Sequence, residues 1–233
     1  MRTPLQGVLQ IMRFNWPFYA ASVVVMGVTA WLGGLFTVVA LGTGYMTVAS
    51  LAASYWVYDH SDLYTLRWLD EALPTPCRQA VNLHAGLDEF TALLQARYPA
   101  TAWRTADFYN AAEMTEASIA RARTEGADPL DYRHWPYPDA SLDAASFLFA
   151  AHEIRHPGGR QALFAEALRT LRPGGRLFVL EHLRDLPNLL VYGPGAFHFF
   201  SRPTWLTAWP GFVLREERRL TAFTRLFILE KPC

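Results

Sequence analysis

The chain has 233 residues, which is enough for one α/β domain of ordinary size and a smaller appendage. Its 21 basic residues balance its 21 acidic residues, so no excess of positive charge indicates a nucleic-acid partner, and none is expected. Two cysteines, Cys77 and Cys233, are too few for a disulfide framework or a zinc knuckle. This cysteine usage favours a reducing compartment.

The N-terminal quarter contains a long stretch without charge. None of the 45 residues from Phe14 to Tyr58 is Asp, Glu, Lys or Arg. One bilayer crossing needs about 20 apolar residues, so the stretch predicts two helices, at about 14–33 and 35–56, joined at Gly33-Gly34. Aromatic residues stand near the expected interfaces. We therefore predict that residues 1–58 form a hairpin of two transmembrane helices in the lipid bilayer.

Two other interpretations compete with the transmembrane hairpin. The apolar core of a cleaved signal peptide has about 7–15 residues, and this stretch is about three times longer, which argues against a signal peptide. A hairpin that lies in the interface or inside a soluble core stays open, because the second segment is only moderately apolar. It contains five hydroxyl side chains: Thr37, Thr43, Thr47, Ser50 and Ser54.

The positive charges around the hairpin predict its orientation. Arg2 and Arg13 precede the first expected span, Arg67 follows the second, and the turn between them carries no charge. By the positive-inside rule both ends lie in the cytoplasm. We therefore expect a protein of the inner (cytoplasmic) membrane whose soluble domain faces the cytoplasm.

The rest of the chain predicts an α/β fold. Residues 59–76 are expected to form an amphipathic linker helix, and in residues 77–233 apolar runs alternate with amphipathic segments. Such alternation is typical of a doubly wound, mostly parallel sheet that ends in an antiparallel strand pair. The expected strands are 80–83, 102–106, 126–130, 144–150, 176–181, 212–218 and 222–230, and the expected helices are 89–98, 112–123, 159–171 and 205–209.

The first two expected strands carry a candidate ligand site. A doubly wound sheet binds a nucleotide-like ligand over the carboxyl ends of its strands, using a glycine turn and an acidic side chain about 20 residues later. Gly86 lies in the turn after the first strand, and Asp107 follows it by 21 residues at the end of the second. Asp107 is therefore the candidate that binds ribose hydroxyls, with Phe108 beside it.

The segment from Asp131 to Glu181 has the most specific pattern. After Asp131, the chain has Trp-Pro-Tyr-Pro-Asp at 135–139, Ser-Leu-Asp at 141–143, His-Glu-Ile-Arg-His at 152–156 and Leu-Arg-Pro-Gly-Gly-Arg at 171–176. This order resembles the class I S-adenosylmethionine-dependent methyltransferases, in particular those that act on quinone precursors and other lipids. The resemblance covers about 78–231 and is specific in its second half.

The resemblance implies a Rossmann-like fold with S-adenosylmethionine as the cofactor. It implies that Asp131, with Tyr132 beside it, faces the adenine amino group, and that His152 and Glu153 lie near the transferred methyl group. Either of the latter side chains could orient or deprotonate an acceptor hydroxyl, and a histidine with an ordinary pKa near 6.5 is suited to this at neutral pH.

The first turn departs from the family pattern. The family has an acidic residue two positions before Gly-x-Gly-x-Gly, whereas here Asn82 replaces the acid, His84 and Asp88 replace the outer glycines, and Gly86 alone remains. Glycine keeps side chains away from the ligand and adopts positive φ. Three explanations stay open: a remodelled pocket in which Asn82, His84 and Gly86 still bind the cofactor, a different ligand or chemistry, or lost catalysis.

A weaker resemblance bears on this turn. Membrane-associated methyltransferase-like enzymes of rhodoquinone biosynthesis also have a glycine-poor first turn, an aromatic lead-in like Tyr55-Trp56 and a His-Glu pair after the fourth strand, like His152-Glu153. Their implied substrate is a quinone in the bilayer. We therefore predict a membrane-anchored S-adenosylmethionine-dependent methyltransferase for a lipophilic acceptor such as a quinone, a phenolic lipid or an isoprenoid.

Two alternative functions remain. A methyltransferase-like scaffold in the membrane would need no catalysis. A membrane zinc peptidase is the other, because 152–156 fits H-E-x-x-H, in which two histidines one helical turn apart bind zinc. Pro157-Gly-Gly159 would end such a helix at once, and we expect no metal site.

Overall fold

The computed structural model describes residues 3–124 and 126–233, which divide into two compact units. The first unit, here called the hairpin unit, contains the described part of residues 1–61 together with Arg184–His198. The second, the sheet unit, contains Asp62–Leu183 and Phe199–Cys233. The chain therefore leaves the sheet unit once, after the fifth strand, and returns to it.

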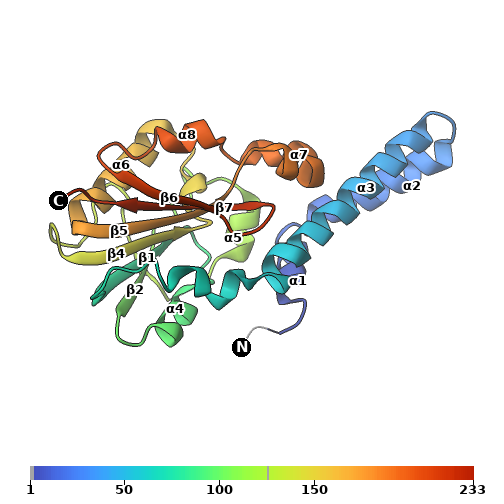
Figure 1. The fold of residues 1–233 in the computed structure, drawn as a ribbon. Coiled ribbons are helices and arrows are strands. Elements are labelled where there is room, and N and C mark those ends of the chain that lie inside the picture. The colour runs from blue at the N-terminus through green and yellow to red at the C-terminus, as the bar shows by residue number, and fades with distance from the viewer. Residues whose placement is uncertain (1–2, 125) are drawn as a thin grey trace. The chain divides into compact units, whose positions relative to one another are not determined.

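The sheet unit is built on seven strands in the order β3-β2-β1-β4-β5-β7-β6 (Figure 1). Strands β1 to β5 pair in parallel, and β7 pairs antiparallel with both β5 and β6. This confirms the predicted doubly wound sheet with an antiparallel end. The strands are β1 Gln79–His84, β2 Ala102–Asp107, β3 Asp128–Pro129, β4 Leu142–Leu148, β5 Leu171–His182, β6 Val213–Arg219 and β7 Thr224–Glu230.

Helices cover both faces of this sheet, which explains its apolar central strands. All seven residues of β4 are buried, as expected of a parallel strand covered on both sides. Helix α6 (Pro157–Thr170) and helix α8 (Arg202–Leu206) lie along one side, and α4 (Thr91–Arg97) lies along the other (Figure 1). Helix α5 spans Ala117–Ala122, which is shorter than the predicted 112–123, and β3 is shorter than the predicted 126–130.

The linker prediction was wrong. Instead of one amphipathic helix over 59–76, a π-helical turn at Trp56–His60 is followed by 3-10 turns at Asp62–Thr65 and Arg67–Leu69. The backbone at Leu66 is left-handed, with a φ of +58°, and this residue separates the two 3-10 turns. A residue in that conformation cannot continue a right-handed helix, so the segment is broken there.

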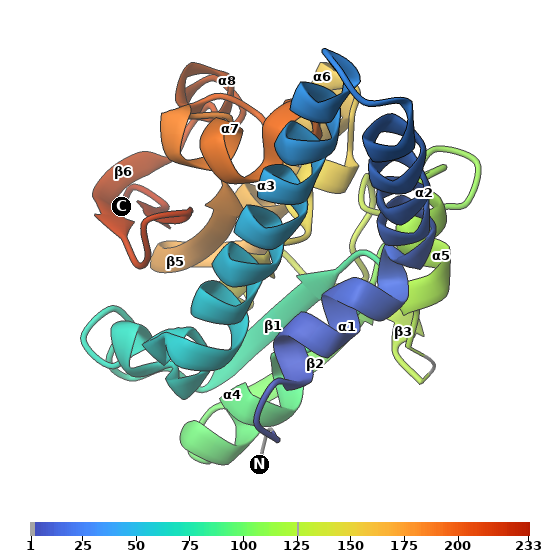
Figure 2. The same ribbon diagram turned by 90° about the vertical axis from the view of Figure 1, so that its right-hand side faces the viewer.

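The hairpin unit contains α1 (Gln6–Phe14), α2 (Trp16–Leu32), α3 (Phe36–Tyr55), α7 (Leu186–Tyr192) and a 3-10 turn at Gly193–His198. Helices α2 and α3 lie side by side and are joined at Gly33 and Gly34, both with positive φ (Figure 2). Glycine adopts this conformation without the strain that a side chain would cause. The predicted turn therefore lies where expected.

One helical run in the described residues, Phe36–Thr65, is long and apolar enough to cross a membrane. Helix α2 is apolar too, but its 17 residues are shorter than a full span. The structure thus gives one candidate span where the sequence predicted two. Arg2, which contributed to the predicted orientation, lies outside the described residues.

Candidate active site

The candidate site residues gather at one edge of the sheet. Strands β1 to β5 run in parallel, so the residues that end or follow them lie along their common carboxyl edge. The first turn follows β1, Asp107 ends β2, Asp131 comes shortly after β3, and His152 follows β4. Ligands of doubly wound sheets bind at this edge.

At the ends of β4 and β5, His152 and Glu181 form a buried contact between an imidazole ring and a carboxylate. Nδ1 of His152 lies 2.6 Å from Oε2 of Glu181, and the backbone N–H of His152 donates to Oε1 of the same carboxylate at 3.3 Å. Nε2 of His152 lies 3.1 Å from Oε1 of Glu153. Glu181 is completely buried, so this ring is fixed between two carboxylates.

These carboxylates change the protonation of His152. Burial by itself opposes the charged imidazolium, but Glu181 and Glu153 outweigh it and raise the pKa of His152 well above the ordinary value. The resting histidine is therefore protonated at neutral pH. Sequence reasoning proposed no role for Glu181, although an acidic residue that ends the apolar run 177–180 was a usable signal, since unpaired acids are rarely buried.

The zinc-peptidase motif does not have the helical form that zinc binding requires. His152 and Glu153 belong to a 3-10 turn at Ala151–Glu153, and the backbone is extended at Ile154 and His156. The His156 side chain accepts a hydrogen bond from the N–H of Gly158 and so caps α6. The two histidines are thus not one turn apart on a helix, and His156 has a structural explanation.

The first turn is tied together by its own polar side chains. Asn82 Oδ1 accepts from the hydroxyl of Ser146 at 2.7 Å, and its Nδ2 donates to Thr91 Oγ1 at 3.0 Å and Asp88 Oδ1 at 3.3 Å. Asp88 Oδ1 also accepts the N–H of Thr91, and Oδ2 accepts the hydroxyl of Thr105. Asn82 is therefore engaged in joining β1 to β4 and to the start of α4.

Asp107, predicted to bind the ribose hydroxyls, holds the backbone of Gly86. Its Oδ1 accepts the N–H groups of Gly86 at 2.8 Å and Tyr109 at 2.9 Å. Gly86 has a φ of +88°, and a β-carbon there would lie 3.3 Å from Ile119. Glycine is needed at this position for its backbone conformation and for the close approach of α5. The carboxylate of Asp107 therefore holds the turn directly through these two hydrogen bonds.

His84 is enclosed rather than presented to a ligand. The residue is buried, and neither ring nitrogen has a hydrogen-bond partner in the described structure. Nδ1 lies 3.7 Å from Asp107 Oδ1. Burial lowers the pKa of His84 despite the nearby carboxylates of Asp88 and Asp107, so the ring stays neutral at pH 7. The large side chain that replaces a family glycine therefore points into the protein.

A cavity of about 400 Å³ lies between the loops that follow β2 and β3. Ligand sites commonly have volumes of about 300–1,000 Å³ with mainly aromatic and apolar walls. The wall of this cavity is mixed, because it combines aromatic rings with one carboxylate and the two guanidinium groups of Arg123 and Arg133. Its lining residues include three of those predicted for the cofactor, Phe108, Asp131 and Tyr132, with Tyr109, Leu130 and Arg133.

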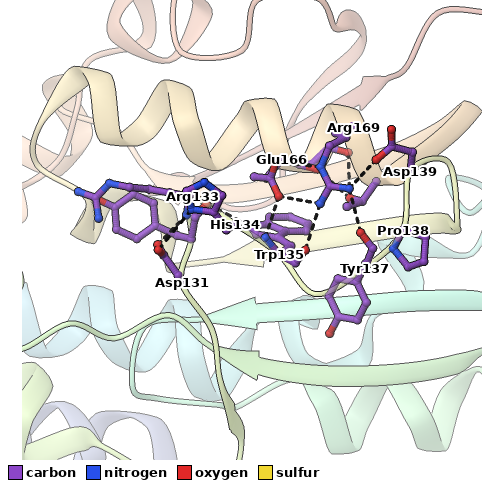
Figure 3. A network of polar contacts seen from close by, with 12 residues as sticks. Asp131, Arg133, His134, Trp135, Tyr137, Pro138, Asp139, Glu166 and Arg169 are labelled. Carbon is purple, nitrogen blue, oxygen red and sulfur yellow. Dashed lines mark hydrogen bonds and ion pairs between the residues drawn. The ribbon is translucent and has the colours of Figure 1, made fainter.

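The loop that contributes Asp131 and Tyr132 is fastened to α6. Arg169 donates to the carbonyl oxygen of Trp135 and to the carboxylates of Asp139 at 2.6 Å and Glu166 at 2.7 Å (Figure 3). Glu166 also accepts the N–H of Trp135 at 2.7 Å. These contacts hold the segment 131–139, so the position of the cavity wall depends on α6.

The predicted site residues therefore divide into four groups. Phe108, Asp131 and Tyr132 line the cavity, Gly86 and Asp107 bond to each other, and Asn82 and His84 are enclosed. His152 and Glu153 form a separate cluster with Glu181. The residues predicted to bind the cofactor and those predicted to transfer a proton thus lie at different parts of one edge.

Residues 86–179 match the protein family described as "Methyltransferase domain". The demethylmenaquinone methyltransferase of Thermus thermophilus is 30% identical over 124 residues, covering 50% of this chain and 54% of the relative. The ubiquinone/menaquinone biosynthesis C-methyltransferase UbiE of Roseobacter denitrificans is 35% identical over 86 residues, 33% of each chain. The chain thus spans about half or less of these relatives.

Solved structures agree on the fold. The pyocyanin biosynthetic protein PhzM matches with a TM-score of 0.57 at 14% identity, over 99% of this chain and 77% of that one. An O-methyltransferase family 2 protein from Planctomyces limnophilus, in complex with apigenin, matches with a TM-score of 0.53 at 20% identity, over 84% and 68%. These likenesses show that the sheet unit has a methyltransferase-like fold.

Proposed function

We propose that this chain is a membrane-anchored S-adenosylmethionine-dependent methyltransferase that acts on a lipophilic acceptor carrying a hydroxyl group. The acceptor class is a quinone in its reduced form, a phenolic lipid or an isoprenoid. Two of the relatives are named for ubiquinone, menaquinone or demethylmenaquinone, which favours the quinone class.

The buried Glu181–His152 contact is the observation that carries this proposal. The imidazole of His152 is paired with a carboxylate and lies at the carboxyl edge of the sheet, where we propose that the cofactor binds. There it is suited to take a proton from an acceptor hydroxyl. Because Nδ1 is held by Glu181, the proton arrives at Nε2, the nitrogen that faces Glu153. The ring is protonated at rest, so it acts as a base only after losing that proton, and the reaction should become faster as the pH rises.

The cavity after β2 and β3 supplies the cofactor contacts in this proposal. Phe108 and Tyr132 would enclose the adenine, Asp131 would accept its amino group, and Asp107 would take the ribose hydroxyls. When bound, S-adenosylmethionine supplies an electrophilic methyl group on sulfur. The residues of this chain would hold the acceptor hydroxyl against that methyl group. Positioning of the two reactants accounts for most of such acceleration.

Membrane anchoring is proposed from the exposed side chains of α2 and α3. Leu35 is 87% exposed and Leu41 is 70% exposed, although both are strongly apolar. Soluble surfaces rarely show apolar patches this extensive. Other exposed apolar residues on the two helices are Val23, Val24, Val28, Trp31, Phe36, Val38 and Val48. With Arg13 and Arg67 at the flanks, the proposed location is the inner membrane, with the sheet unit in the cytoplasm.

A titration tests the proposal against the scaffold alternative. The purified chain in detergent is titrated with S-adenosylhomocysteine by calorimetry, and one saturable site is expected. The chain is then supplied with methyl-labelled S-adenosylmethionine and a reduced short-chain quinone, and label is expected to enter the organic extract. Absence of binding would favour a scaffold, and binding without transfer to any hydroxyl acceptor would contradict the catalytic role.

A further inference from the structure

The segment between β5 and α8 has an unusual composition. Leu186 to Ser201 contains 16 residues without Asp, Glu, Lys or Arg, the longest such run outside the Phe14–Tyr58 stretch. Arg184 and Asp185 precede the run, and Arg202 follows it. A charge-free segment bounded by charges on both sides is what an element that dips into an apolar medium requires.

This segment packs within the hairpin unit. The Tyr45 hydroxyl of α3 donates to the carbonyl oxygen of Leu190 at 3.3 Å. Gly193 lies so close to α3 that a β-carbon there would be 2.7 Å from Cε of Met46. Both ribbon views show α7 beside α3 (Figures 1 and 2). Helix α7 and the turn Gly193–His198 therefore belong with the helices that we propose to be in the membrane.

The polarity of α7 is reversed from that of a helix on a water-facing surface. Its polar groups are turned inward, because Asp185 caps the helix at the N–H of Asn188, and Asn188 is completely buried. Its large apolar side chains are turned outward, with Leu186 67% and Leu190 54% exposed. In the following turn Phe197 is 62% exposed. Such a surface is unfavourable in water and suited to hydrocarbon.

We propose that α7 and the turn Gly193–His198 form a third membrane element, which inserts Leu186, Leu190 and Phe197 into the bilayer beside α3. The occupant of this surface is the lipid itself. This inference rests on the proposed anchoring by α2 and α3. Tyr45 lies ten residues before Tyr55, about 15 Å along α3. That is half of a hydrocarbon core about 30 Å thick, so if α3 leaves the core at Tyr55, its contact with α7 lies near the bilayer midplane.

Site-specific quenching tests this insertion. Cys77 and Cys233 are replaced by serine, and a single cysteine is placed at Leu190 and labelled with an environment-sensitive fluorophore. The full chain is reconstituted in phosphatidylcholine and phosphatidylglycerol vesicles and exposed to doxyl-labelled lipid or to aqueous iodide. Leu41 on α3 serves as the hairpin reference. Val213 on β6, an apolar side chain 43% exposed in the sheet unit, is the matched water-facing control.

The expected result is that the label at Leu190 is quenched by doxyl lipid at least threefold more strongly than the label at Val213, and by iodide at least threefold less. If Leu41 is quenched by lipid but Leu190 behaves like Val213, the third element is wrong and the hairpin anchor stands. If neither Leu41 nor Leu190 is quenched by lipid, the proposed anchoring fails together with this inference. Circular dichroism and S-adenosylhomocysteine binding verify that each labelled chain is folded.

Discussion

The first turn and the ends of β4 and β5 use polar side chains in different ways. In the first turn, Asn82 and Asp88 direct their side-chain bonds to neighbouring strands and to α4. At the ends of β4 and β5, His152 is held between two carboxylates. The side chains of the first turn thus hold neighbouring elements together, whereas the region at the ends of β4 and β5 contains groups that can exchange protons.

Replacement of His152 by alanine should have the largest effect. If this ring is the general base, kcat should fall at least 100-fold, which corresponds to about 2.7 kcal/mol. Binding of S-adenosylhomocysteine should change little, because the cavity residues are on other loops. Methyl transfer is measured with labelled cofactor, and His60→Ala, at an exposed histidine outside the sheet unit, is the control. A His152→Ala variant with normal kcat would remove the proton-transfer role from this region.

Asn82→Asp tests the first turn directly, since it restores the acid of the family pattern. We expect unfolding free energy to fall by about 2 kcal/mol, because a donor is lost and a second carboxylate is placed about 3.3 Å from Asp88. The measurement is chemical denaturation at pH 8 and pH 5, with a smaller loss at pH 5, where one carboxyl group can take a proton.

The double variant Asn82→Asp/Asp88→Asn is the control for Asn82→Asp. It exchanges the two groups and removes the charge repulsion, so part of the stability should return. Affinity for S-adenosylhomocysteine should not rise in either variant. If Asn82→Asp instead binds more tightly without loss of stability, the first turn is an ordinary cofactor turn and the contrast between the two regions disappears.

The main strands were predictable because each is an apolar run between turn residues. Strand β4 was expected at 144–150 and observed at Leu142–Leu148, and β2 was expected at 102–106 and observed at Ala102–Asp107. The placement of Gly86 and Asp107 at one edge of the sheet was also predictable, since parallel neighbours bring the ends of β1 and β2 together, but their direct contact was not predicted. A hydrogen bond of 2.8 Å joins the two residues.

The partners of Asn82 and His152 could not be predicted in the same way. Asn82 meets Ser146 because these residues stand opposite each other in the β1–β4 register, and periodicity does not specify register. Glu181 meets His152 for a similar reason, since Glu181 lies in β5 and His152 in the turn after the adjacent strand β4, 29 residues away. The grouping of Arg184–His198 with the hairpin unit likewise depends on packing that no local pattern contains.

Asp107→Ala should have a moderate effect on the affinity for S-adenosylhomocysteine. It tests whether the first turn and the cavity contribute to one binding site. It leaves the N–H groups of Gly86 and Tyr109 without their acceptor, so the turn loosens. Affinity for S-adenosylhomocysteine should fall at least tenfold, about 1.4 kcal/mol. The Asp107→Asn control keeps an acceptor oxygen and should restore stability but not affinity, because a carboxylate binds ribose hydroxyls more strongly. An unchanged affinity in Asp107→Ala would exclude Asp107 from the cofactor site.

The smallest expected effect is a displacement of the pH profile. Burial opposes the charged form of His152, yet Glu181 and Glu153 raise its pKa, so the deprotonated base becomes available only at higher pH. The pH dependence of kcat/KM should therefore show a limb that rises above the ordinary histidine range. Glu181→Gln removes the larger of the two attractive charges and should move this limb to lower pH, further than Glu153→Gln does. A limb that stays in place, or moves to higher pH, would mean that a group other than His152 controls the proton transfer.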